Sequence, residues 1–171
     1  LVLRTDKLAI NVTHARNCLT QRMLYPRCMA AVTVDASGLH NGDVAGICAL
    51  QSCYGFLGIS KVAGNYYLVK VIRTEDKLKH SPCMGDCMPG EVVEKIRLSQ
   101  SRIRLCLKAD FENLKDKLDF YYKKNGHLVK VGTSHKLVYR LDHFTGYRFG
   151  LFVYSTQETG GEAVFKDFTY L

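Results

Sequence analysis

Hydrophobic and polar residues alternate along most of the chain with a period of two, which is the pattern of a β-strand with one buried face. In residues 101–110, Ile103 and Leu105 point to one side, whereas Arg104 and Lys108 point to the other. The same alternation occurs in residues 28–34, 117–123 and 148–153. Helical periodicity is almost absent, and only residues 112–117 are expected to form a single helical turn. The pattern therefore predicts a chain built from β-strands.

Turn-forming residues separate these segments. Asn125-Gly126 follows one alternating segment, and this pair is the strongest short signal of a β-hairpin. Residues 63–65, Ala-Gly-Asn, separate two further segments. About a dozen short strands follow one another at the spacing typical of a sandwich or barrel. We predict an all-β fold in which two antiparallel sheets pack as a sandwich, with residues 76–90 as a long loop within it.

Length and composition bound the class of protein. A chain of 171 residues fits one domain, so residues 1–171 are expected to form a single sandwich. Its 47% apolar and 23% charged residues are typical of a globular protein. No run of 18 apolar residues occurs, so no membrane partner is expected. The net charge of +8 (24 − 16) would suit nucleic acid, but the basic residues are spread along the chain and no nucleic-acid partner is expected.

The seven cysteines bear on redox state and metal binding. Their odd number favours unpaired thiols and a reducing, cytoplasmic compartment over a disulfide framework. His80, Cys83, Asp86 and Cys87 have the residue types of a metal site, but no second pair at zinc-site spacing accompanies them. We therefore expect no metal centre, and a loop that holds two unpaired thiols. A structural calcium ion is kept as an alternative, although no Asp-x-Asp-x-Asp run marks a calcium loop. No other cofactor is indicated.

Catalytic signatures are missing from the chain, and we name no catalytic residue. There is no Gly-x-Ser-x-Gly and no glycine-rich loop before a helix. The sequence alone cannot pair two of its sixteen acidic residues for glycoside chemistry. Tyr66, Tyr67 and Tyr121 lie in strand-like segments, where an outward ring could stack on a sugar. Cross-strand packing explains the same rings equally well, so they are a candidate sugar platform and no more.

Six stretches, taken in order, resemble a known family. They are Ala15-Arg-Asn-Cys-Leu-Thr-Gln-Arg22, Asn41-Gly-Asp-Val-Ala-Gly-Ile-Cys-Ala-Leu-Gln51, Tyr54-Gly-Phe-Leu-Gly-Ile59, Asp119-Phe-Tyr-Tyr122, Phe144-Thr-Gly-Tyr-Arg-Phe-Gly-Leu-Phe152 and Ala163-Val-Phe-Lys-Asp-Phe-Thr-Tyr170. Nearly end to end, the chain resembles the C-terminal domain of family 43 glycoside hydrolases, which are β-xylosidases and α-L-arabinofuranosidases. The resemblance implies a concanavalin-A-like jelly roll that follows a five-bladed β-propeller, and the propeller carries the catalytic carboxylates.

The propeller that carries the catalytic carboxylates is not part of these residues, and this limits the function that the resemblance implies. The chain opens without Met and is expected to be a segment of a larger enzyme that acts on xylan or arabinoxylan. It would be a non-catalytic accessory domain that stabilises the propeller and hydrolyses nothing alone. Its partners would be the propeller of the same chain and xylo- or arabino-oligosaccharides; a homo-oligomer stays open.

The resemblance also implies site residues. In several family xylosidases this domain lends an aromatic ring to the mouth of the active site, and the matching position is Phe144, flanked by His143 and Thr145. A ring there would exclude water and limit the length of the substrate. An ordinary aromatic at a strand edge is the alternative for Phe144.

An apolar docking surface is expected if the domain packs on a propeller. Its candidates are Leu19, Met23, Leu24 and Tyr25. Two functions of other classes remain as alternatives. A free-standing carbohydrate-binding module would need an exposed tyrosine platform, and a lectin-fold enzyme would need facing carboxylates or a Tyr-His-Arg cluster in a groove.

Overall fold

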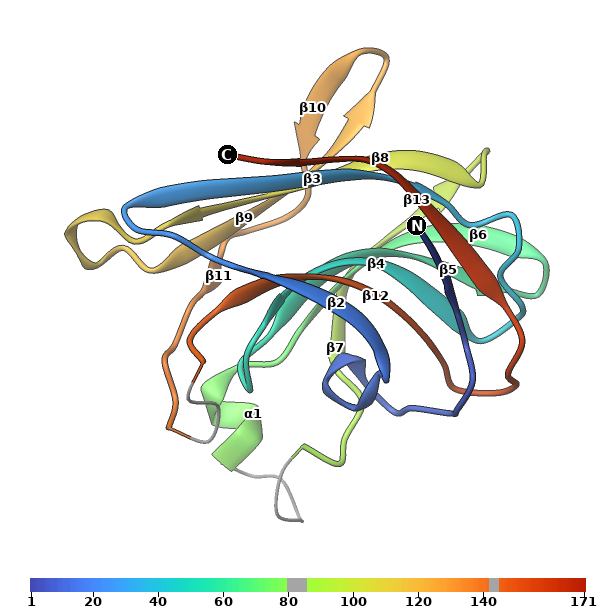
Figure 1. Cartoon of the computed structure of the whole chain (residues 1–171), viewed down its shortest axis with the longest axis horizontal. Helices are drawn as coiled ribbons and strands as arrows, with labels where there is room; N and C mark the ends of the chain where they lie inside the picture. Colours follow the sequence, from blue (N-terminus) through green and yellow to red (C-terminus); the bar gives the residue numbers. More distant parts are fainter. Residues whose placement is uncertain (80–85, 142–144) are drawn as a thin grey trace.

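Two antiparallel β-sheets pack face to face, as Figure 1 shows. The computed structural model describes residues 1–79, 86–141 and 145–171, and these ranges contain 13 strands. The seven-stranded sheet has the order β1 (Val2–Arg4), β13 (Glu162–Tyr170), β3 (Arg27–Asp35), β8 (Arg102–Asp110), β9 (Lys117–Lys124) and β10 (His127–Lys130), and β11 (His135–Lys136) also pairs with β9. The six-stranded sheet has the order β2 (Asn17–Arg22), β12 (Arg148–Ser155), β4 (Asp43–Leu50), β5 (Gly55–Val62), β6 (Asn65–Ile72) and β7 (Glu91–Leu98). The predicted two-sheet sandwich is confirmed.

Helices are short, and they lie in the connections. Among the described residues they are the 3₁₀ turns η1 (Val12–His14) and η2 (Glu112–Leu114) and the α-helix α1 (Glu75–Lys79). The helical turn expected within residues 112–117 is therefore present as η2, whereas α1 falls where a loop was expected. In the described part of the chain, no helix has the length and hydropathy needed to cross a membrane.

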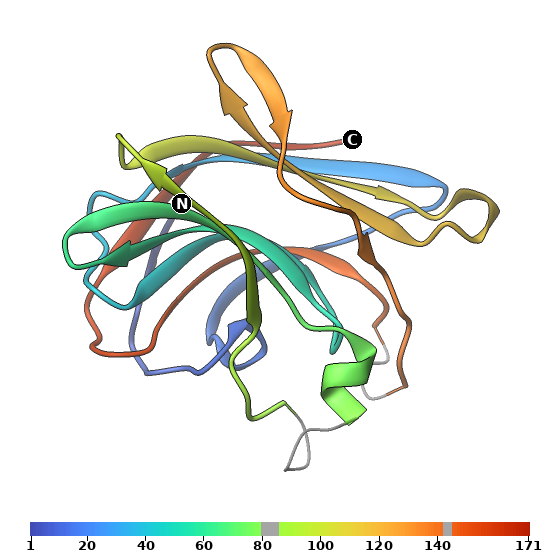
Figure 2. The same ribbon diagram turned by 180° about the vertical axis from the view of Figure 1, so that it is seen from behind.

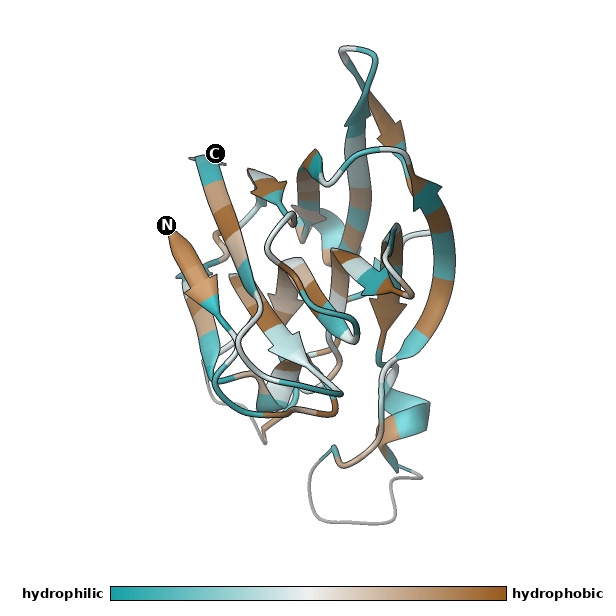
Figure 3. Cartoon of the chain, turned by 90° about the vertical axis from the view of Figure 1, so that its right-hand side faces the viewer, coloured by the Kyte–Doolittle hydropathy of each residue, from teal (hydrophilic) through white to brown (hydrophobic). Residues whose placement is uncertain are grey.

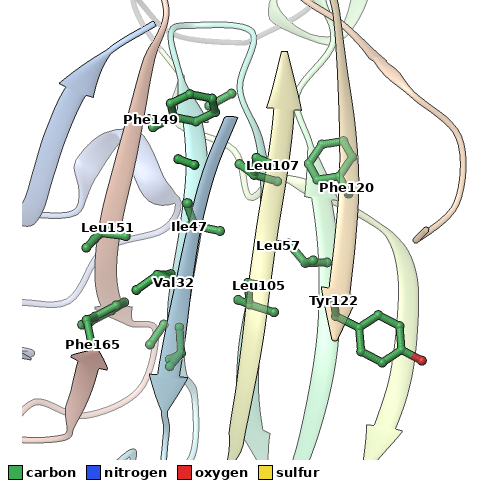
Figure 4. Close-up of a cluster of buried hydrophobic side chains, with 14 of the residues drawn as sticks. Val32, Ile47, Leu57, Leu105, Leu107, Phe120, Tyr122, Phe149, Leu151 and Phe165 are labelled. Carbon is green, nitrogen blue, oxygen red and sulfur yellow. The ribbon is translucent and has the colours of Figure 1, made fainter. Parts of the chain in front are cut away.

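The main hydrophobic core lies between the two sheets. Leu105 of β8 and Phe120 of β9 face Ile47 of β4 and Phe149 of β12, as the close-up in Figure 4 shows. In β8, β9 and β12 these positions are the apolar half of a period-two segment, so the alternation in the sequence becomes the inner face of these strands. Figure 3 shows the matching change between hydrophilic and hydrophobic residues along the strands.

Two tight turns confirm the predicted hairpins. Asn125 and Gly126 have φ values of 49° and 84° between β9 and β10. Ala63 and Gly64 have φ values of 47° and 74° between β5 and β6. Left-handed backbone at both central residues matches the twist of the flanking strands, which is why Asn-Gly is favoured in such turns. The β9–β10 hairpin projects from the body of the sandwich in Figures 1 and 2.

A second core covers the concave outer face of the six-stranded sheet. Phe56 of β5 and Phe152 of β12 lie on this face with ring centroids 4.8 Å apart. Val12 of η1 packs on the same cluster, and Figures 1 and 2 place η1 beneath the curved sheet. Gly46 of β4 faces Gly58 of β5 on this side, where a Cβ on Gly46 would collide with the neighbouring backbone. The central strands are therefore buried on both faces.

Residues 86–90 are held against this concave face by a buried ion pair. Arg73 donates through Nη2 to Oδ1 of Asp86, and the two side chains are only 6% and 5% exposed. The side-chain amide of Asn11 donates to the carbonyl oxygens of Asp86 and Met88 at 3.0 and 2.9 Å. Cys87 is disulfide-bonded, so the expectation of unpaired thiols in this loop is wrong at that position.

Candidate functional site

A hollow of about 520 Å³ lies at one end of the sandwich, which we call the loop end. Three connections meet there: residues 23–26 between β2 and β3, residues 111–116 between β8 and β9, and the 137–147 connection between β11 and β12, through its described residues 137–141 and 145–147. Tyr25 and Leu114 lie on the rim of the hollow, 74% and 85% exposed. Exposed apolar side chains that gather around a hollow are the usual sign of a docking surface.

The predicted docking residues divide between this end and its flank. Leu24 and Tyr25 are exposed, as expected for a docking surface. The expectation for Met23 is wrong, because its side chain is buried in the main core and its amide donates to the carbonyl oxygen of Tyr147. Leu19 is exposed but lines a different groove, along the edge of β2.

The 137–147 connection is fixed at both ends by one buried phenol. The hydroxyl of Tyr147 donates to the carbonyl oxygen of Cys53 at 2.6 Å and accepts the amide of Val138 at 3.0 Å. Burial raises the pKa of this phenol, so it remains a protonated donor at any physiological pH. The amide of Leu137 donates to the carbonyl oxygen of Asp116 at 2.6 Å, which joins the connection to the neighbouring one.

The exposed middle of the same connection is tied to other elements. The side-chain amide of Gln51 donates to the carbonyl oxygen of Arg140 at 3.1 Å. The guanidinium of Arg140 lies 3.5 Å from the carboxylate of Glu75 in α1. Tyr139 and Leu141, on either side of Arg140, are exposed. The loop end is thus a defined surface whose described backbone is held in place.

Of the three predicted rim residues, only Thr145 lies within the described residues. Thr145 is exposed and lines the hollow beside Tyr139. His143 and Phe144 lie outside the described residues. The rim role of all three therefore stays a prediction.

The structure places the three platform tyrosines on different surfaces. Tyr66 packs against the main core, Tyr67 against the concave-face cluster, and Tyr121 lies on the outer face of the seven-stranded sheet, opposite Cys106. A lysine ammonium lies over each ring, with distances to the ring centroid of 5.4 Å for Lys61 on Tyr66, 4.4 Å for Lys95 on Tyr67 and 5.0 Å for Lys108 on Tyr121. The rings do not form one platform, and sugar binding by any one of them stays a prediction.

The residues considered for a metal site do not converge in the described structure. Asp86 is paired with Arg73, Cys87 is in a disulfide, and His80 and Cys83 lie outside the described residues. Within residues 1–79, 86–141 and 145–171, no three His, Cys, Asp or Glu side chains gather as metal ligands would.

Comparison with protein families settles what kind of domain this is. The model of the β-xylosidase C-terminal concanavalin-A-like domain matches residues 1–171. The chain belongs to this family. The resemblance seen in the sequence is therefore confirmed, and with it the jelly-roll class of the sandwich.

Several longer proteins of known structure contain a domain similar to this β-xylosidase C-terminal domain. A bifunctional GH43–CE protein of Bacteroides eggerthii has 35% identity and a TM-score of 0.87, over 99% of this chain and 20% of that one. A GH43 glycoside hydrolase engineered to display both endo-xylanase and exo-arabinofuranosidase activity has 27% identity and a TM-score of 0.85, over 99% and 34%. A xylan β-1,4-xylosidase from Bacillus halodurans shares the fold, with 16% identity and a TM-score of 0.72 over 99% and 32%. The chain thus spans about a third or less of these proteins. Comparison with curated proteins gave no match.

Sequence reasoning missed part of the loop end of this β-xylosidase C-terminal domain. Leu114, Tyr139 and Leu141 are exposed there, beside the predicted Leu24 and Tyr25. A signal for Leu114 was present, because an apolar residue within a short polar turn has no core to face. Tyr139 and Leu141 follow a strand-like alternation in the sequence, so only the structure shows that they point outward.

Proposed function

We propose that this chain is the accessory domain of a family 43 glycoside hydrolase that acts on xylan or arabinoxylan, and that its loop end docks onto the catalytic β-propeller. Membership of the β-xylosidase C-terminal domain family supports the first part. The observation that carries the second part is the gathering of exposed apolar side chains on three connections around one hollow. The substrate class is supported by the endo-xylanase and exo-arabinofuranosidase activity named for the relative with 27% identity.

The exposed side chains of the loop end would stabilise such a contact. Tyr25, Leu114, Tyr139 and Leu141 are more than half exposed. Complete burial of a large apolar side chain contributes about 1.5–3 kcal/mol. Four such side chains supply several kcal/mol, and an intramolecular contact loses less translational and rotational freedom than association of separate proteins.

The proposal includes a role for this end of the domain at the rim of the active site. Thr145 lies on the connection that Tyr147 and Gln51 hold to the sheet, and Phe144 and His143 precede it in the chain. In this proposal the loop end faces the propeller, and this connection approaches the substrate entrance. An aromatic ring and its polar neighbours at that entrance would exclude water and disfavour long substrates.

The proposal is tested in the full-length enzyme with three variants. Phe144→Ala should change the ratio of kcat/KM between long and short xylo-oligosaccharides without changing the melting temperature. The double variant Tyr139→Ser with Leu114→Ser should lower the temperature at which the two domains unfold together. Leu128→Ser is the matched control, since Leu128 is exposed on β10, a strand that does not line the hollow. An unchanged substrate ratio for Phe144→Ala would remove the rim role, and an unchanged melting temperature for the double variant would remove the docking role.

The binding-module alternative is tested by calorimetric titration of the chain with xylo- and arabino-oligosaccharides. The accessory role predicts no heat of binding at millimolar sugar. A saturable signal that Tyr121→Ala abolishes would favour the alternative. The ammonium groups over all three candidate rings argue for the first outcome, because a ring face that contacts a lysine is not open to a sugar.

A further inference from the structure

An apolar groove opens on one side of the sandwich, between the edge of β2 and the edge formed by β1 and β13. Its volume is about 370 Å³, and its apolar lining residues are Leu1, Leu19, Phe149, Leu151, Phe165 and Phe168. Leu1, Leu19 and Phe168 are about half exposed, whereas the other three belong to the main core. The groove is therefore a place where the core itself is left open between two sheet edges.

A β-bulge in β13 turns Phe168 toward this groove. The pairing of β13 with β3 shifts register between Lys166 and Thr169. Asp167 has a φ of 52°, a left-handed conformation that is unfavourable for a residue other than glycine, asparagine or aspartate. Bulges re-aim side chains and interrupt regular pairing. Here the bulge leaves Phe168 45% exposed on the rim of the groove.

The backbone at Leu1 runs along β13, at the edge of the sheet that borders the groove. Leu1 and Phe165 exchange two backbone hydrogen bonds, of 3.1 and 2.8 Å, and Val2 pairs with Val164 in antiparallel register. A residue before Leu1 that continued this strand would lie opposite Lys166, and the next would lie opposite the bulge. Within the described residues, no strand pairs with β13 on this side beyond Leu1. Figures 1 and 3 show the N-terminal strand beside β13.

Resting on the proposed function, which places the catalytic domain before Leu1 in the chain, we propose that the segment preceding Leu1 continues β1 along β13 and covers this groove. The side chains of Leu1 and Leu3 both face inward, since Leu1 lines the groove and Leu3 packs on the main core. With a period of two, the second residue before Leu1 points the same way. We expect that residue to be apolar and its side chain to contact Phe168 and Leu19. The segment pairs with backbone groups of β13 that would otherwise form an open sheet edge.

A photo-crosslinker at position 168 tests this occupant directly. Benzoylphenylalanine replaces Phe168 in the full-length protein, and a second protein carries it at Leu128, which is 46% exposed and lies on β10. After irradiation, mass spectrometry should find position 168 joined to the peptide immediately before Leu1, and position 128 not joined to it. A crosslink from position 168 to another part of the catalytic domain, a crosslink to a second copy, or no crosslink would each overturn the proposal.

A measurement on the unmodified full-length protein guards against a variant that does not fold. Hydroxyl-radical footprinting compares Phe168 with Leu128, because the two have nearly equal exposure in the domain alone. With each rate divided by the rate for the same residue in urea, Phe168 should be modified several-fold more slowly than Leu128. Equal normalised rates would overturn the proposal. This result is independent of the Phe144→Ala and loop-end variants, so failure of the groove proposal is distinguishable from failure of the proposed function.

Discussion

Removal of the guanidinium of Arg73 is expected to loosen residues 86–90 from the concave face and to destabilise the whole domain. In Arg73→Ala the carboxylate of Asp86 stays buried without its cation, and the carbonyl oxygen of Pro89 loses a second, 3.5 Å contact with the guanidinium. A buried charge without a partner is unfavourable because the protein interior solvates it far less well than water does. The free energy of unfolding should therefore decrease markedly.

The expected size of the effect follows from the burial of the pair. Removing one partner of a buried ion pair costs about 3–5 kcal/mol. For a domain of this size, each kcal/mol lowers the melting temperature by about 3 °C. Arg73→Ala should therefore melt about 9–15 °C below the parent chain. Arg73→Met combined with Asp86→Leu should recover most of this loss, because the double variant leaves no buried charge.

Thermal unfolding followed by circular dichroism measures these differences. Arg102→Ala is the matched control: Arg102 pairs with Asp35 at 2.6 Å, but its side chain is 58% exposed. An exposed pair contributes about 0–1 kcal/mol and weakens in salt, whereas the buried pair should be insensitive to 1 M NaCl. If Arg73→Ala and Arg102→Ala melted within 3 °C of one another, the argument that burial makes the Arg73–Asp86 pair important would be wrong.

Three further predictions concern the core and the loop end. Tyr147→Phe removes the hydrogen-bond acceptor of the Val138 amide and should lower the free energy of unfolding, measured with urea, by about 1–3 kcal/mol. An unchanged urea midpoint would show that water replaces the hydroxyl. Burial lowers the pKa of His135, with a further contribution from the nearby Lys70 charge, so the unfolded chain takes up the proton first. The free energy of unfolding should therefore decrease as the pH falls below about 6.5. Between pH 6.5 and 5 it should change less steeply with pH in His135→Gln than in the parent chain, and equal slopes for the two proteins would contradict this. Gly46→Ala should cost at least about 1–3 kcal/mol because the new Cβ meets the backbone of β5, and a thermal melt like that of the parent would mean that the two strands separate easily.

The sheets were largely predictable from the sequence, because hydrophobic and polar residues alternate along most strands with a period of two. The segments 28–34, 117–123 and 148–153 all lie within strands. The concave-face core was not foreseen, although the nearly continuous apolar run of residues 44–50 is typical of a strand buried on both faces. The alternation within residues 148–153 predicts a solvent-facing Phe152, whereas Phe152 is fully buried in the cluster that also contains Val12 of η1.

The candidate site was less predictable, because it depends on long-range placement. Tyr139 and Leu114 are far apart in the sequence from Tyr25, and only the closure of the sandwich brings their connections together. The burial of Arg73 likewise requires Asp86, which no local pattern pairs with it. Charged residues are almost never fully buried unless paired, so a sequence-based prediction assigns both to the surface.

The burial of the central strands of the six-stranded sheet on both faces affects how the loop end moves. The amide groups of β4, β5 and β12 are shielded from solvent on either side, so they should exchange hydrogen only when the whole domain opens. Cys53 precedes β5 and Tyr147 precedes β12, and both anchor the 137–147 connection. The surface proposed to meet the catalytic domain is thus attached to the part of the molecule that is expected to exchange most slowly. Its orientation should persist through the local fluctuations that fray the outer strands β7 and β10.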